Sequence, residues 1–410
     1  MTQALTILRP WRALCALFAA TALVVACGGG ADSGVGTGGT GSPQSFSQGP
    51  ITGFGSIIVN GVHFDDSGAS VMDDDGNALS HSADLRLGTV VDVEGGAVSN
   101  GAAAASTIRV HVDLVGPVTA AFDAASGRLA VLGQPVRVVS TTALDGFSGG
   151  AAAIAAGARV AVSSLYDKAT GVYVATRIDP ATSASHFAIR GAPSAIDTTA
   201  RTFTIGGVVF SYGNVAPPAT FAAGTLLRAV LATAPDGQGR WVVTAFGQGQ
   251  APLPDGRSGG VDGVVSSVTD ATHFVVNGVS VDASGARITP TGAAIGVQSR
   301  VVVQGTVAGG VLVASAVHVR AAHDNDDDQG GAVDGGDNGN DAIELDGAIL
   351  ALDAAHQTFT MRGPTTVSYA SASFAGGTAA DLAAGKWVEV RGNLSADGSV
   401  VVARKVKFGH

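Results

Sequence analysis

The sequence predicts an all-β protein that consists of about five small barrels in tandem. Apolar residues make up 46% of the 410 residues, charged residues only 14%, and glycine occurs 59 times. This composition suits many short strands joined by tight turns, and no long helix is evident. A hairpin signal at Ser56–Asp65 has alternating apolar runs on both sides of Asn60-Gly61. Asn-Gly readily takes the two positive φ angles of a type I′ turn, and similar hairpins return four times.

The turn glycines of these hairpins lie at a nearly constant spacing. They are separated by 72, 74, 71 and 85 residues and are Gly61, Gly133, Gly207, Gly278 and Gly363. The longest interval contains an acidic insert at residues 324–341, so the underlying period is close to constant. Five variants of one template at one spacing indicate internal duplication.

The first copy shows the five-strand template. A glycine-bearing first strand at residues 50–53 precedes the hairpin, and a loop then leads to a short segment that is closed by Gly88. Alternating strands follow at residues 89–95 and 107–113. Five short strands with one apolar face need to close in order to hide their edges. We therefore predict OB-like barrels, with the Gly88 segment at the place of the OB capping helix. A blade or an open meander is the alternative.

The later copies repeat these elements in the same order. Their hairpins are predicted at residues 129–138, 202–210, 273–282 and 358–363. Segments closed by glycine come before the fourth strand at residues 153–157, 220–224 and 381–385. The predicted divisions are a signal peptide (1–26), a lipid anchor with a Gly-rich linker (27–49), OB-like repeats (50–113, 114–180, 186–248, 259–321 and 342–408) and an acidic linker (322–341).

The first 27 residues resemble a bacterial lipoprotein signal. Arg9 and Arg12 supply a positive n-region, an apolar run follows, and small or aliphatic residues directly precede Cys27. The resemblance implies cleavage before Cys27, lipidation of its thiol and attachment to the cell envelope. Gly28 favours the outer membrane. The alternatives are an ordinary secretory peptide and a short transmembrane anchor, although a 14-residue apolar run is short for a bilayer.

Charge and aromatic content argue against nucleic-acid binding. The formal net charge is −10, and loss of the two signal arginines makes the mature chain more acidic still. Such a surface repels nucleic acid. Basic residues form only a short cluster at 404–407, and Trp241 and Trp387 are expected in barrel cores. Because Cys15 leaves with the signal and Cys27 carries lipid, we predict no disulfide.

Catalytic motifs occur only in unsuitable contexts. Gly34–Gly39 matches the dinucleotide-binding pattern, but no strand precedes it and no helix follows. Gly146–Gly150 and Gly256–Gly260 match the nucleophile-elbow pattern, yet both are expected in loops of a β-rich chain. No nucleophile, base and orienting group appear together. The sequence therefore predicts no enzymatic activity and no cofactor.

Two groups of residues are weak candidates for a metal site. His63, His81 and His111 of the first copy could bind a metal if they converged, although single strand histidines are more often solvent-facing. Oxygen ligands in the acidic insert resemble the first half of a calcium loop. They are Asp324, Asp326 and Asp328. No bidentate glutamate follows at the required spacing, so a solvated linker is the other interpretation. Asp73–Gly76 is expected to form a hairpin turn.

The repeats resemble the bacterial family named domain of unknown function 5666, which is common in Gly-rich lipoproteins. The resemblance rests on Gly-Phe-Gly-Ser-Ile-Ile-Val-Asn-Gly-Val at 53–62 and on its echo at 274–279, and it covers most of residues 50–408. Copies two and five differ at the turn, where the chain has Gly133-Gln134 and Arg362-Gly363. The resemblance implies an OB-like fold and brings no catalytic or ligand residues with it.

Together these patterns predict a non-enzymatic cell-envelope lipoprotein that presents repeated modules for structural or protein-interaction roles. Similar modules on one chain suit multivalent weak binding. The alternative is a protein that binds an envelope polysaccharide or another small ligand such as a metal ion. The predicted partners are the membrane, through the lipid on Cys27, and an envelope protein or polysaccharide.

Overall fold

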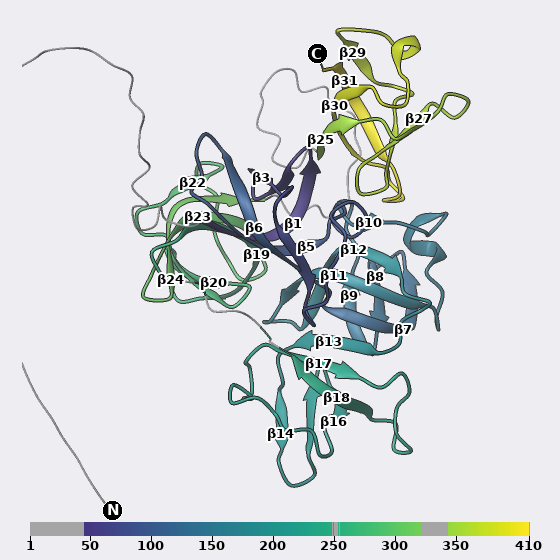
Figure 1. Ribbon diagram of the computed structural model, residues 1–410. Coiled ribbons are helices and arrows are strands. Elements are labelled where there is room, and N and C mark those ends of the chain that lie inside the picture. Colours follow the sequence, from purple (N-terminus) through teal and green to yellow (C-terminus); the bar gives the residue numbers. More distant parts are fainter. Residues whose placement is uncertain (1–44, 248, 250–252, 254, 321–342, 410) are drawn as a thin grey trace, which may run out of the picture. The chain divides into compact units, whose positions relative to one another are not determined.

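The computed structural model describes residues 45–247, 249, 253, 255–320 and 343–409 (Figure 1). Its regular elements are strands, apart from two short 3₁₀ helices at Gly150–Ala153 and Ala379–Asp381. Within these residues, no helix is long and apolar enough to cross a membrane. The predicted all-β class is confirmed.

The first repeat contains six strands, five of which close into a ring. They are β1 (Ser45–Phe54), β2 (Ile57–Val59), β3 (Val62–Asp65), β4 (Ser70–Asp73), β5 (Val90–Gly95) and β6 (Ala102–His111). β1 pairs antiparallel with β2 and β5, β2 with β3, and β5 with β6, while β3 runs parallel to β6. This circular order is that of a closed OB-like barrel, so the blade and the open meander are excluded. The short β4 adds a parallel pairing with β6.

The other four repeats follow the same order. The second has β7 (Leu114–Asp123), β8 (Arg128–Val131), β9 (Gln134–Arg137), β10 (Ala143–Leu144), β11 (Arg159–Asp167) and β12 (Val172–Pro180). The third has β13 (Phe187–Gly191), β14 (Ala195–Asp197), β15 (Thr202–Ile205), β16 (Val208–Ser211), β17 (Leu227–Leu231) and β18 (Trp241–Gly247). In this repeat the first strand is divided into β13 and β14, which pair with β17 and β15.

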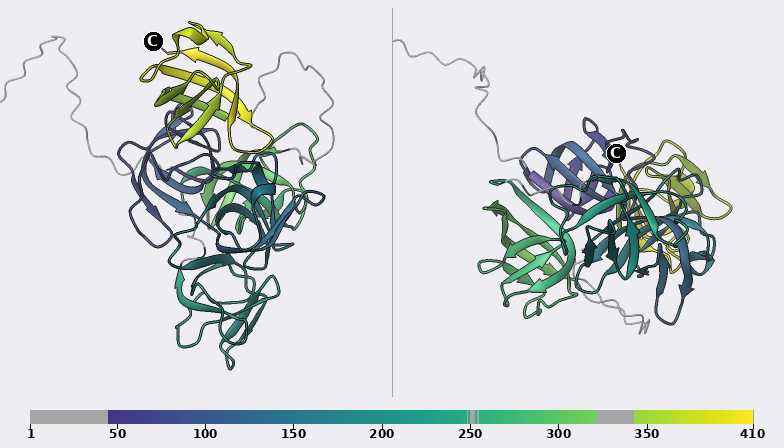
Figure 2. Two further views of the ribbon diagram at one scale, coloured as in Figure 1. Left: turned by 90° about the vertical axis from the view of Figure 1, so that its right-hand side faces the viewer. Right: turned by 90° about the horizontal axis from the view of Figure 1, so that it is seen from below.

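The fourth and fifth repeats complete the series. The fourth has β19 (Ser258–Val268), β20 (His273–Val276), β21 (Val279–Asp282), β22 (Arg287–Thr289), β23 (Arg300–Ala308) and β24 (Val311–Val319). The fifth has β25 (Ile343–Ala348), β26 (Ala351–Asp353), β27 (Thr358–Met361), β28 (Thr365–Ser368), β29 (Ser373–Ala375), β30 (Trp387–Leu394) and β31 (Val401–Phe408). Figure 2 shows the strands of this last repeat, in yellow, curling around one another.

The hairpin turns have the predicted backbone. Asn60-Gly61 has φ angles of 55° and 76°, and Asn277-Gly278 has 49° and 79°. In the second repeat the turn is Leu132-Gly133, at 53° and 78°, and not Gly133-Gln134 as predicted. The reason is that Gln134 already pairs with Val131 in the β8–β9 ladder.

A glycine in the first strand makes room for the side chain of the turn residue. A Cβ added to Gly49 would lie 2.7 Å from Oδ1 of Asn60, and one added to Gly116 would lie 2.5 Å from Leu132. The Asn60 amide uses this space to donate a hydrogen bond from Nδ2 to the carbonyl of Gln48, at 3.0 Å. The pairing of a strand glycine with a turn side chain is therefore part of the repeated unit.

Two predictions are wrong, namely the capping helix before the fourth strand and the extension of the linker to residue 49. The segment that ends at Gly88 forms turns, not a capping helix, and its Leu85 and Leu87 side chains are buried in the core. These two side chains fill the barrel end, so a helix is not needed there. The linker predicted at 27–49 overlaps β1, because Ser45–Pro50 pairs with β5 despite its weak strand propensity.

The repeats are joined to one another through their first strands. β1 runs parallel to β19 over Ser45–Gln48 and parallel to β25 at Gly53-Phe54. β7 pairs antiparallel with β13 through Leu114 and Val115. The described residues of all five repeats belong to one compact unit. The tandem barrels are therefore connected by main-chain hydrogen bonds as well as by the chain.

Buried apolar side chains also connect different repeats. One cluster contains Phe64 of the first repeat and Phe359 of the fifth. A second contains Tyr173 of the second repeat and Phe203 of the third. A third fills the fourth repeat and includes Phe46 from β1. Burial of apolar surface thus stabilises the contacts between repeats as well as each barrel.

Candidate functional site

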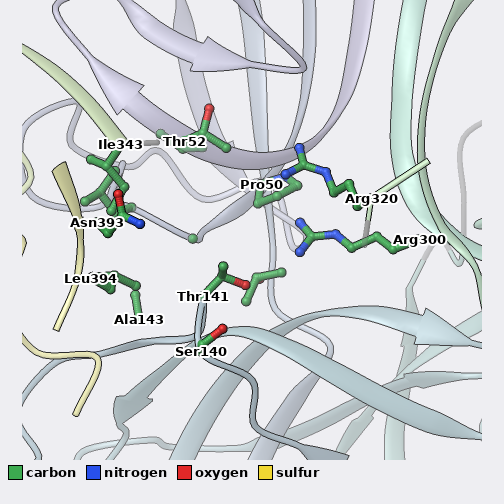
Figure 3. Close-up of a pocket in the computed structure, with 14 residues that line it drawn as sticks. Pro50, Thr52, Ser140, Thr141, Ala143, Arg300, Arg320, Ile343, Asn393 and Leu394 are labelled. Atoms are coloured by element: carbon green, nitrogen blue, oxygen red, sulfur yellow. The ribbon is translucent and has the colours of Figure 1, made fainter. Parts of the chain in front are cut away.

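A pocket of about 260 Å³ lies where the first, second, fourth and fifth repeats meet (Figure 3). Its apolar lining residues are Pro50, Ile51, Leu87, Ala143, Ile343 and Leu394. Its polar lining residues are Thr52, Ser140, Thr141, Thr176, Arg300, Arg320 and Asn393. The pocket can therefore contact apolar groups and also offers hydroxyl, amide and guanidinium groups.

Gly88 allows the first two repeats to approach closely at the edge of this pocket. Its φ is +77°, and a Cβ added there would lie 2.2 Å from the carbonyl oxygen of Thr176 in β12. Only glycine fits this combination of a left-handed backbone and a neighbouring main-chain atom. The position of the pocket wall thus depends on this residue.

Arg300 and Arg320 give the pocket its charge. Arg300 donates from Nε and Nη2 to the two oxygens of Asp262, at 3.3 and 3.2 Å, and Arg320 donates from Nη2 at 3.3 Å. The Asp262 side chain is only 1% exposed. Figure 3 shows both guanidinium groups extending from the same side toward the middle of the pocket. One buried carboxylate is therefore shared by two cations.

A groove of about 730 Å³ continues from the pocket and shares Ser140, Thr141, Arg300 and Arg320 with it. The groove follows β8, β9 and β12 of the second repeat and adds two exposed arginines, Arg128 and Arg137. Its residues from the fourth repeat are Val264 of β19, residues 297–300 at the start of β23, and Arg320 after β24. The pocket and groove thus form one continuous surface that carries both polar and apolar side chains.

A second polar site is buried between the first three repeats. Nδ1 of His111 lies 2.7 Å from Asp74, and Nε2 lies 2.8 Å from Asp92. Asp74 also contacts Arg190, and its other oxygen lies 3.5 Å from Nε of Arg228. These ion pairs, which we call the His111 cluster (Asp74, Asp92, His111, Asp113, Arg190 and Arg228), connect β4 to β13 and β17.

The charges of this cluster shift the pKa values of its members. Burial by itself would lower the pKa of His111, but the attraction of Asp92 and the hydrogen bond to Asp74 outweigh it and raise the pKa to about 9. Burial would raise the pKa of Asp74, yet His111 and Arg190 hold it well below its usual value. His111 is thus a cation at neutral pH, suited to pairing with carboxylates and not to accepting a proton.

The predicted histidine site does not form. His63 is exposed on β3, Nε2 of His81 is hydrogen-bonded to the carbonyl of Ala69 at 2.9 Å, and His111 belongs to its cluster. No group of three metal-ligating side chains occurs among the residues that the structure describes. Four predicted site residues lie outside those residues, and they are Cys27, Asp324, Asp326 and Asp328.

Of the three catalytic motifs, Gly34–Gly39 lies outside the described residues. The structure describes the two nucleophile-elbow matches. Ser148 sits in a turn before a single 3₁₀ turn, whereas Ser258 begins β19 and does not lie in a loop as predicted. In the part of the chain that the structure describes, no long helix follows either serine. Trp241 packs against the Phe187 ring at 5.7 Å, which agrees with a core role.

Trp387 does not lie in a core, contrary to the prediction. Its residue is 52% exposed, and its indole Nε1 donates to Asp346 on the outer face of the fifth barrel. Val388, the next residue on β30, points inward and is fully buried. The alternating pattern correctly predicts a strand here, but Trp387 belongs to its outer face.

Sequence reasoning also missed the His111 cluster. Asp73 forms the predicted turn, because its Oδ1 accepts from the amides of Asp75 and Asn77 at 2.9 and 2.8 Å. Asp74, however, turns inward and is only 6% exposed at its side chain. The available signal for this cluster was a run of three acidic residues in a chain that has few charged residues. A buried carboxylate in such a run requires cations nearby.

Three segments of the chain match a known family. The family described as Domain of unknown function (DUF5666) matches residues 48–109, 115–179 and 346–407, which correspond to the first, second and fifth repeats. The second and fifth are matched although their turns differ, while the echo at 274–279 lies outside the matched segments. No curated protein matches the chain. The chain is therefore a repeat protein of OB-like barrels that resembles the DUF5666 family, whose function is not assigned.

Proposed function

We propose that this chain is a non-enzymatic lipoprotein of the bacterial cell envelope whose repeats serve as structural or protein-interaction modules. A lipid on Cys27 attaches it to the outer membrane, and the Gly-rich segment that follows gives the folded repeats reach. The residues that precede Cys27 support the anchor, and the acidic composition supports a partner that is not nucleic acid.

The observation that carries the interaction role is the joining of repeats through their first strands. β1 is hydrogen-bonded to β19 and to β25, so main-chain pairing holds the first repeat against the fourth and the fifth. Modules fixed in this way can engage an extended partner at several points, which raises the effective concentration of each contact. One lipid anchor on Cys27 is then enough for several repeats to contact the partner at the same time.

The anchor is tested with a Cys27→Ala variant expressed in a bacterium that processes lipoproteins. The wild-type chain is expected to incorporate an alkyne-tagged fatty acid and to sediment with outer membranes, and the variant to do neither. Equal labelling of both proteins, or a wild-type chain found unacylated in the soluble fraction, contradicts the proposed anchor.

The interaction role is tested by cross-linking the tethered protein in its own envelope, followed by affinity capture and mass spectrometry. A partner that recurs with the wild-type chain, and that is lost when the repeats are deleted but the anchor kept, supports the role. Recovery of the same set with the anchor alone contradicts it.

A second candidate function is the binding of an envelope polysaccharide or another small ligand. The observation that favours it is the pocket lined by Arg300 and Arg320, together with the groove that continues from it. Hydroxyl, amide and guanidinium groups occur there together with apolar side chains, as in many ligand sites.

A further inference from the structure

Three pairs of arginines lie directly opposite one another on neighbouring strands. Arg190 pairs with Arg228 in the β13–β17 ladder, and Arg128 pairs with Arg137 in the β8–β9 ladder. Arg300 faces Arg320 across β23 and β24, where the Arg320 amide donates to the Arg300 carbonyl at 2.9 Å. Like charges placed directly opposite each other destabilise a sheet unless something offsets their repulsion.

Two of the three pairs are offset by carboxylates of the chain itself. Arg228 donates to both oxygens of Asp75, at 2.6 and 3.0 Å, and Arg190 contacts Asp74. The pair of Arg300 and Arg320 shares the oxygens of Asp262. In both of these pairs, the groups that offset the repulsion between the arginines are therefore carboxylates.

The third pair has no such carboxylate. Within the described residues, no acidic side chain lies within 4.0 Å of the Arg128 or Arg137 guanidinium. Asp123 is opposite Arg128 on β7, but its oxygens accept from the Ala125 amide and the Ser126 hydroxyl, at 3.1 and 2.6 Å. Both arginines are exposed and line the 730 Å³ groove.

The groove lies on the face that OB-folds use for ligands. β8 and β9 are the second and third strands of the second barrel. Asp167 ends β11, and Thr170 lies in the connection from β11 to β12, the last two strands of this barrel. OB-folds bind oligosaccharides and oligonucleotides with these elements. The opposite wall adds Arg300, whose Nη1 bonds to none of the described residues.

We propose that this groove binds a carboxylated polysaccharide, with the carboxylates of successive acidic sugars on Arg128, Arg137 and Arg300. Guanidinium groups bind carboxylates through paired, charge-assisted hydrogen bonds. Hydroxyl and amide side chains at Ser140, Thr141 and Gln298 supply partners for the sugar hydroxyls. This inference rests on the second candidate function and names its ligand class.

The composition of the groove favours a saccharide over a nucleic acid. Single-stranded nucleic acids are held mainly by bases that stack on aromatic side chains. None of the described residues that line the groove is aromatic, and its apolar positions are small, with Pro135, Val172, Val174 and Val264 among them.

The test uses the full chain in detergent and calorimetric titration with short oligogalacturonates. Neutral malto-oligosaccharides and a glutamate oligopeptide of equal length serve as comparison ligands. The Arg128→Gln/Arg137→Gln variant removes the two exposed charges. An Arg287→Gln/Lys386→Gln variant removes two exposed charges elsewhere and is the matched control. Circular dichroism checks that both variants keep their sheet content.

We expect oligogalacturonate to bind the wild-type chain and the Arg128→Gln/Arg137→Gln variant to bind about tenfold more weakly, with the control changed by less than about twofold. Equal binding of the neutral sugar would overturn the role of the arginines, and equal binding of the glutamate peptide would overturn the saccharide assignment. If the wild type binds no oligogalacturonate but still captures a partner in the cross-linked envelope, this inference fails while the proposed interaction role stands.

Discussion

His111 and Asp74 are 37 residues apart in the chain, yet Nδ1 of the histidine lies 2.7 Å from the Asp74 carboxylate. His111 ends β6, and Asp74 follows β4 directly. Asp74 in turn contacts Arg190 on β13, so this one carboxylate connects the first repeat to the third. The His111 side chain is only 11% exposed, which leaves these interactions weakly screened by solvent.

The stability of the protein is predicted to fall as the pH rises from about 6.5 through 9. The pKa of His111 is about 9 in the folded chain and about 6.5 when unfolded, so the charged histidine stabilises the fold fully below pH 6.5. This contribution, about 1–3 kcal/mol, disappears as His111 loses its proton. Urea unfolding at several pH values measures it.

His111→Gln is expected to flatten this dependence, whereas His63→Gln on the exposed face of β3 keeps it. The carboxylates act at the other end of the scale, because the lowered pKa values of Asp74 and Asp92 remove stability as the pH falls below about 4. Burial raises the pKa of Asp113, which has the opposite effect in acid. A His111→Gln curve as steep as that of the wild type between pH 6.5 and 9 contradicts the assignment.

Replacing Asp74 by asparagine is predicted to destabilise the protein by about 3–5 kcal/mol, because Arg190 and Arg228 lose a buried counter-ion. Asp145→Asn is the control. Its side chain is 50% exposed, and the two arginines that it meets, Arg86 and Arg177, both keep Asp179 as a partner, so a loss below about 1 kcal/mol is expected. Chemical denaturation of both variants gives the comparison, and similar losses for the two would refute a special role for Asp74.

Gly259→Ala is predicted to separate β19 from β1. A Cβ at this position would lie 2.1 Å from the carbonyl oxygen of Phe46, a main-chain atom that cannot rotate away. We expect a loss of about 1–3 kcal/mol and faster amide exchange at residues 45–48. Gly68→Ala is the control, because nothing lies within 4 Å of its added Cβ. Unchanged exchange in the Gly259→Ala variant would disprove the close approach.

The barrels could be predicted because their signals are local. Asn60-Gly61 specifies its own turn, and the alternation on each side specifies which residues enter the core. Even in the second repeat, where leucine takes the place of asparagine, Gly133 kept the position of the hairpin within one residue. Spacing between such turns then revealed the repeats.

The contacts between repeats could not be predicted in the same way. Ser45–Gln48 has weak strand propensity and becomes a strand only because β5 and β19 pair with its two edges. The inward turn of Asp74 depends on Arg190 and Arg228, which lie more than 100 residues away in the chain. The exposure of Trp387 depends on which face of β30 meets the core. Each of these features is decided by tertiary pairing, which a local pattern does not specify.

The central claim, that first strands join the repeats, is tested most directly by a cysteine pair at Ser45→Cys and Ser258→Cys. These residues are register partners in the parallel β1–β19 pairing, and neighbouring strands place Cα atoms within disulfide range. Mild oxidation is predicted to yield a peptide that links residues 45 and 258 in mass spectrometry, and neither single variant gives it. A folded double variant that stays reduced at both positions would show that β1 and β19 do not pair.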